Sequence, residues 1–63
     1  MTTLEFAHKM FRIDIKEGMY REDRDVHVWE DLSISEQKSY MDEAEAYMKL
    51  PPEEWVDFAF YNV

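Results

Sequence analysis

The chain has no cysteine, one glycine and two prolines among its 63 residues. Without cysteine it can form neither a disulfide nor a thiolate metal site, which fits a reducing compartment. One glycine cannot build a glycine-rich phosphate loop. No apolar run approaches the ~18 residues of a membrane span. The N-terminus mixes acid, base and histidine, unlike a signal peptide. We therefore expect a cytoplasmic protein.

Basic residues are scarce in the C-terminal two-thirds. Residues 25–63 contain ten acids and two bases, and so carry the whole net charge of −8, whereas residues 1–24 contain five of each. The same acidic stretch holds both tryptophans and three of the four tyrosines. This charge opposes direct binding to DNA, RNA or an anionic membrane. It favours a protein partner with a basic surface.

The length predicts one small domain over residues 1–63. A chain of this size buries only about 60% of its unfolded surface, so its stability is marginal. At 46% hydrophobic and 16% aromatic, however, the composition is too apolar for a disordered chain. A homodimer or docking on a partner would supply further stability.

Residues 2–17 have the pattern of an amphipathic helix. Thr2 and Glu5 have capping-box spacing, and Gly18 stands where a left-handed cap ends a helix. Apolar residues fall in two adjacent stripes: Leu4, Ala7, Phe11 and Ile15, then Phe6, Met10 and Ile13. So wide an apolar arc predicts the central helix of the domain, covered by the others. The alternative is that part of this arc is an interface.

Residues 19–30 begin with a dense charged run, which indicates an exposed loop. Residues 26–29 then alternate as a short strand does, but a lone strand has nothing to pair with except across a dimer. We therefore expect an extended connection that places Val26, Val28 and Trp29 in the core.

A second helix is expected from Ser33 to Leu50, before the two prolines end it. Ser33 and Glu36 form another capping box, with Ser35 as a competing cap. Its apolar face is made of Tyr40, Met41, Ala44, Tyr47 and Met48. A third helix of about nine residues is expected to begin at Pro52 and must pack to be stable. The fold class is therefore all-α, a small three-helix domain with an extended connection between helices 1 and 2.

The order Trp29, Leu32, Ser33, Glu36, Lys38, Tyr40, Glu43 and Ala44 resembles the second-helix region of an HMG box, and small phage accessory proteins are similar in the same way. The resemblance covers residues 29–44 and implies a capped helix packed on a neighbour. An HMG box is basic and bends DNA. This chain is acidic and lacks the basic first helix and tail, so the resemblance implies no DNA contact residue.

No catalytic constellation is evident. His8 and His27 lie in different segments, and Ser33 and Ser35 are explained as helix caps. The acids around His27 and the group Glu53, Glu54 and Asp57 lack the spacing of a calcium loop, although Glu53 and Asp57 would share a helix face. We expect no enzyme activity, no cofactor and no metal.

The one-sided charge favours a protein-binding modulator, an inhibitor of the phage host-takeover or anti-defence type, that imitates nucleic acid and occupies a basic surface of its partner. The candidate contact residues are Glu36, Asp42, Glu43, Glu45, Glu53, Glu54 and Asp57. One alternative is an assembly protein that dimerises or docks through the first helix and Trp55, Phe58, Phe60 and Tyr61. Another is a DNA-binding regulator, because Lys9, Arg12 and Lys16 share a helix side.

Overall fold

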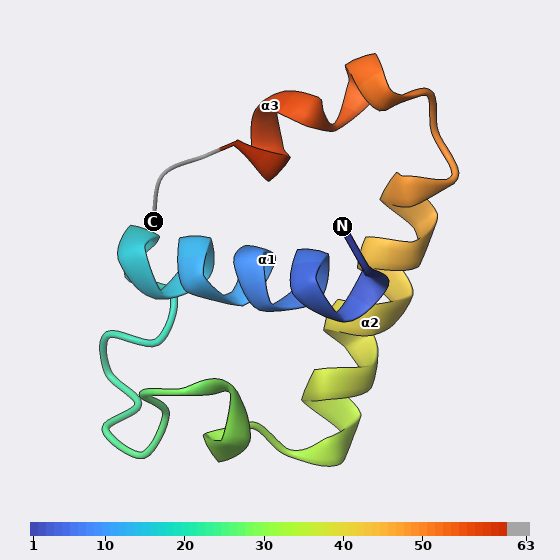
Figure 1. The fold of residues 1–63 in the computed structure, drawn as a ribbon. Coiled ribbons are helices and arrows are strands. Elements are labelled where there is room, and N and C mark those ends of the chain that lie inside the picture. The colour runs from blue at the N-terminus through green and yellow to red at the C-terminus, as the bar shows by residue number, and fades with distance from the viewer. Residues whose placement is uncertain (61–63) are drawn as a thin grey trace.

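The fold is all-α, as predicted. A computed structural model describes residues 1–60, and within them it has three α-helices, two short 3-10 helices and no strand. In chain order the elements are α1 (Thr3–Glu17), η1 (Trp29–Asp31), α2 (Ile34–Met48), η2 (Pro52–Glu54) and α3 (Val56–Ala59). Figure 1 shows α1 in the middle of the molecule, with α2 crossing it, α3 on one side and the connection to α2 on the other.

Helix α1 begins and ends as its sequence predicts. Thr2 Oγ1 accepts a hydrogen bond from the Glu5 amide at 3.1 Å, and Glu5 Oε1 accepts one from the Thr2 amide at 3.0 Å. The bond from the Thr2 amide holds the pKa of the Glu5 carboxyl below its usual value. Gly18 ends the helix with φ of 88° and donates its amide to the carbonyl of Ile15. The left-handed conformation explains why glycine stands there.

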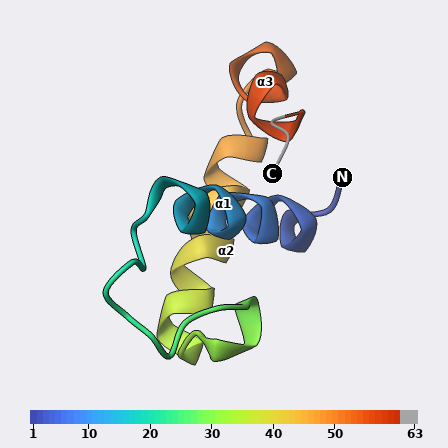
Figure 2. The ribbon, with the colours of Figure 1, turned by 90° about the vertical axis from the view of Figure 1, so that its left-hand side faces the viewer.

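The core is built around α1, which is the central helix. Phe6, Ala7, Met10 and Phe11 are all buried. On one side, the Phe6 ring contacts the rings of Tyr47, Trp55 and Phe58 at centroid distances of 5.5–6.1 Å. On the other, the Phe11 ring contacts Tyr20, Trp29 and Tyr40 at 5.6–6.0 Å. Figure 2 shows the ribbon from the side, with α3 and η1 at opposite ends of α2.

The connection before α2 differs from the prediction at one residue. Val26 is buried and Trp29 packs against the core, as expected, but the Val28 side chain is 52% exposed. The cause is Asp31, whose Oδ2 accepts the amides of His27 at 2.8 Å and Val28 at 3.1 Å. These bonds turn the chain into η1 and leave Val28 at the surface, so the prediction that Val28 enters the core is wrong.

Helix α2 has the predicted cap but a shorter end. Ser33 Oγ and the Glu36 carboxylate exchange hydrogen bonds with each other's amides at 3.1 Å. The helix ends at Met48, two residues before Leu50. Its apolar face enters the core mainly through Tyr40 and Ala44, which are buried.

The third helix is not continuous, contrary to the prediction. The chain forms η2 and then α3, and Trp55 between them has φ of −135° and ψ of −2°. The Trp55 indole explains the break, because its Nε1 donates to the Leu50 carbonyl at 3.1 Å while its ring packs edge-on to Phe6. Glu53 and Asp57 therefore lie in different helices and do not share one helix face. The predicted contact at Tyr61 lies outside the described residues.

Candidate functional site

The predicted contact residues of α2 are all exposed, because the helix packs through its other side. Tyr40 and Ala44 lie one turn apart and face α1. Met41, Tyr47 and Met48 extend this packed side, and the rest of the helix circumference points to solvent. It carries four of the predicted contact residues, namely Glu36, Asp42, Glu43 and Glu45, all exposed. Folding thus leaves these carboxylates available to a partner.

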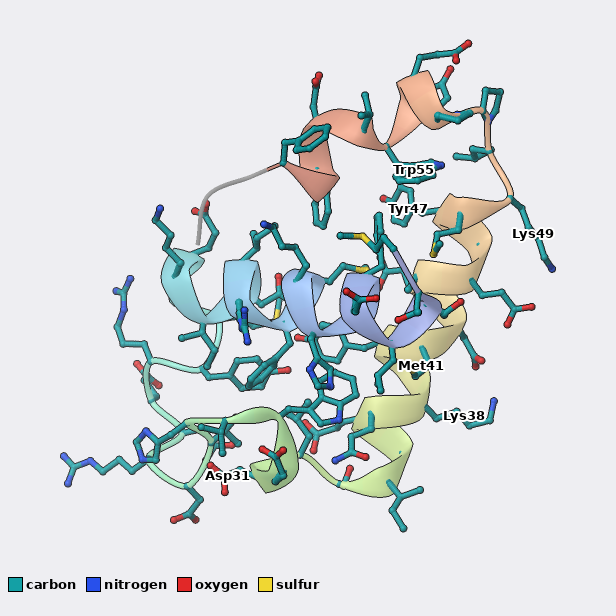
Figure 3. All side chains as sticks on the ribbon, viewed as in Figure 1. Asp31, Lys38, Met41, Tyr47, Lys49 and Trp55 are labelled. Carbon is teal, nitrogen blue, oxygen red and sulfur yellow. The ribbon has the colours of Figure 1, made fainter. Side chains whose placement is uncertain are left out.

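Two of these acids are paired with the two lysines of α2 and its cap. Lys38 Nζ lies 2.8 Å from Asp42 Oδ2, and Lys49 Nζ lies 3.5 Å from Glu45 Oε1. Asp42 holds the pKa of Lys38 above its usual value. Figure 3 shows Lys38 and Lys49 extending away from the core on the same side of α2. This outer strip therefore carries two ion pairs, with charges of both signs, a pattern that the count of acids did not reveal.

Glu36 and Glu43 lie on a different side of α2. Both border a shallow depression of about 260 Å³ next to Tyr20 and Tyr40, with Asp14 of α1 on its other edge. The Asp14 carboxylate accepts a hydrogen bond from the Tyr40 hydroxyl at 2.5 Å. Among the predicted acids of α2, Glu36 and Glu43 thus border the same depression, and Glu36 also caps its own helix.

The remaining predicted residues lie beyond the bend at Pro51. Glu53 and Glu54 are on η2, Asp57 is on α3, and all three are exposed. The seven predicted residues therefore occupy three parts of the surface: the outer strip of α2, the side of α2 next to Tyr20, and the C-terminal segment. These parts hold two, two and three of the residues, and all seven are exposed.

A groove on the opposite side of α1 was not predicted as a site. Its volume is about 710 Å³, and it runs between α1 and residues 27–30. The helix contributes His8, Phe11, Arg12, Ile15 and Lys16. Histidine, arginine and lysine at every fourth position form one row along the helix. This spacing was the feature of the sequence from which one wall of the groove could have been predicted. Sequence reasoning grouped Arg12 and Lys16 with Lys9 as a helix side, but it did not foresee a facing wall.

The facing wall is held in place by several contacts. Asp31 fixes the amides of His27 and Val28, and the two backbone bonds hold the pKa of its carboxyl below the usual value. Gln37 Nε2 donates to the Trp29 carbonyl at 3.1 Å. The Trp29 ring lies 4.4 Å from the His8 ring, measured between centroids. The groove is therefore formed by elements that are anchored independently of any ligand.

Neither a metal-ligand cluster nor a helix able to span a membrane is found in the described part of the chain. Within residues 1–60, no three His, Asp or Glu side chains come close enough to hold a metal ion. None of the helices there combines the length and hydrophobicity needed to cross a membrane. No protein family, curated protein or solved structure matches the chain. The resemblance of residues 29–44 to an HMG box stays a prediction.

Proposed function

We propose that the protein is an acidic binding module that modulates another protein by occupying its basic surface, in place of nucleic acid. One observation carries the proposal. Helix α2 packs through Tyr40 and Ala44, while all the acidic side chains around it stay exposed. A net charge of −8 on this small domain would draw a basic partner by long-range attraction and speed its association.

The two sides of α2 would contribute differently. Asp42 and Glu45 each have a lysine neighbour, so their net attraction for a cation is reduced. Glu36 and Glu43 border the depression beside Tyr20, where an aromatic side chain lies next to the carboxylates. An arginine of the partner matches this combination, because its guanidinium pairs with carboxylates and stacks on aromatic rings. We infer that the side bearing Glu43 contributes more to binding than the outer strip.

A capture experiment at low and high salt tests the proposal. The immobilised protein should retain basic proteins from a host lysate at low salt and release them as salt rises. DNA should compete with the chain for each purified partner. Replacing Asp42, Glu43 and Glu45 by their amides should weaken capture, with Glu43→Gln giving the largest single effect. Each variant should keep its helical circular dichroism, since surface changes cost little.

The matched control carries the same charge change elsewhere. Amide replacements at Glu17, Glu22 and Asp25 alter three exposed acids outside α2. If the two triple variants bind equally well, net charge alone matters and no α2 site exists. If capture does not respond to salt, the electrostatic proposal is wrong.

An assembly protein is the second candidate, favoured by exposed apolar side chains. Ile34 is 85% exposed and Phe60 is 81% exposed, although both are large and hydrophobic. A homodimer that covers them would show little dependence on salt. Sedimentation of the wild type and of Ile34→Ser or Phe60→Ser separates the two candidates, because only the assembly protein requires these residues.

A further inference from the structure

The groove between α1 and residues 27–30 has the composition of a small-molecule site. Small-molecule sites usually measure 300–1,000 Å³ and combine an apolar lining with a few polar groups. The volume of about 710 Å³ falls within that range. Phe11, Ile15 and Trp29 supply apolar and aromatic surface, and the exposed Val28 extends it to one edge.

The charge of the groove is opposite to that of the molecule. Its lining includes Arg12 and Lys16 but a single acid, Glu30, in a chain with a net charge of −8. A small anion would therefore be repelled by most of the surface and attracted here. Arginine also offers paired donors that match a carboxylate or a phosphate.

A polar atom in the wall also lacks a partner. His8 Nε2 is buried and has no hydrogen-bond partner among residues 1–60. Leaving a buried polar group unsatisfied is unfavourable, so this histidine is an exception to the usual satisfaction of buried groups. The His8 ring lies beside Trp29, and His8 belongs to the row on α1 that continues with Arg12 and Lys16. A ligand whose polar group enters the groove and shifts the His8 ring would supply the hydrogen-bond partner that Nε2 lacks.

We propose that this groove binds a small organic anion with a flat apolar body. The body lies against Trp29 and Ile15, and the acid group is held by Arg12 at the rim. The lining of α1 runs from His8 to Lys16, about 12 Å at 1.5 Å per residue, a length that accommodates a ligand of two or three rings. The site is separate from the acidic side chains of α2, so it does not depend on the function proposed above.

Naphthoate is a suitable probe, with naphthyl phosphate as a second acid and naphthylmethanol as the uncharged analogue. Amide NMR spectra of the full chain should shift on titration at residues 8–16 and 27–30 and not around Glu43. Both acids should bind at least about tenfold more tightly than the alcohol. Fluorescence of a Trp55→Phe variant, in which Trp29 is the remaining tryptophan, should report the same affinity.

Arg12→Gln should weaken naphthoate binding about tenfold, while Lys49→Gln, which removes the same charge from the distant end of α2, should leave it unchanged. Equal binding of the alcohol, equal loss in both variants, or shifts located elsewhere would each overturn the proposal. So would binding of an acidic peptide with no binding of either naphthyl acid. If Trp55→Phe does not fold, the wild-type NMR titration decides the question alone.

Discussion

The hydroxyl of Tyr40 donates a 2.5 Å hydrogen bond to the carboxylate of Asp14, twenty-six residues earlier in the chain. The same hydroxyl lies 2.8 Å from that of Tyr20. Three segments, α1, the loop after it and α2, are therefore joined at one point at the edge of the core. The Tyr40 ring is buried against Phe11 and Trp29, so the polar group and the aromatic packing come from the same residue.

Tyr40→Phe should destabilise the fold while keeping its packing. The substitution removes a hydrogen bond to a charged acceptor and leaves two polar groups without their partner, which costs about 1–3 kcal/mol. Urea denaturation measures the change. Tyr47→Phe is the control, because it removes a hydroxyl from a more exposed tyrosine and keeps its stacking on Phe6 and Phe58. Equal loss in the two variants would contradict the role of the Asp14 bond.

Stability should decline in alkaline solution because of Tyr40. Burial, followed by the hydrogen bonds with Asp14 and Tyr20, raises the pKa of this tyrosine far above its usual value of 10.0. Above pH 10.0 the unfolded chain releases the tyrosine proton while the folded chain keeps it, so the free energy of unfolding falls as pH rises. Below pH 10.0 the contribution is complete. Urea midpoints across this range should fall less steeply for Tyr40→Phe than for the wild type.

Asp31→Asn should loosen the wall of the groove. The carboxylate accepts two backbone amides, and these bonds lower its pKa from the usual 3.8. A lowered pKa means that the stabilisation is present above 3.8 and is lost as pH falls through the lower folded value. The variant should therefore be less stable than the wild type at neutral pH, and the difference should shrink in acid. Glu30→Gln, a neighbouring exposed change, should show neither effect.

Gly18→Ala should destabilise the end of α1. The glycine has φ of 88°, and an added Cβ would meet Arg21 Nη2 at 2.7 Å. The arginine can move, so the main cost is the left-handed conformation, about 1–2 kcal/mol. Gly18→Asn should cost less, because asparagine tolerates this region better. Thermal unfolding distinguishes the three proteins, and an alanine variant as stable as the wild type would show that the turn can change conformation.

Phe6→Leu should loosen the C-terminal segment. Phe6 is fully buried and its ring contacts Trp55 and Phe58. Phe→Ala in a core costs about 3–5 kcal/mol, which this small domain is not expected to survive, whereas leucine keeps much of the volume. The near-ultraviolet circular dichroism of Trp55 should weaken. Phe60→Leu, at an 81% exposed position, should leave that signal intact.

The helices were predictable where local chemistry decides them. Both capping boxes, at Thr2 and Ser33, involve residues three apart and need no tertiary information. The break at Trp55 was not predictable, because it depends on an indole reaching Leu50 and Phe6. The exposure of Val28 depends on Asp31, three residues later, so this signal was local but was overlooked. In both cases a side chain with a specific distant or backbone partner overrides the local pattern.

The candidate sites divide in the same way. Exposure of the acids on α2 follows from helical periodicity, and it was predicted. Their pairing with Lys38 and Lys49 follows from spacing of four residues, which the sequence contains but a count of charges overlooks. The groove could not be predicted from the sequence, because His8 and Trp29 come within 4.4 Å of each other, between ring centroids, only when α1 packs against the connection.

The ring contacts of Phe6 and Phe11 lie on two sides of α1. Both rings contact α2, Phe6 through Tyr47 and Phe11 through Tyr40, and each also contacts a second segment, Phe58 for Phe6 and Tyr20 for Phe11. The central amides of α1 are therefore shielded twice, and we expect their hydrogens to exchange with solvent more slowly than those of α2 or α3. A helix covered on both sides in this way joins the C-terminal segment and the connection before α2 into one core, with α2 in contact with both.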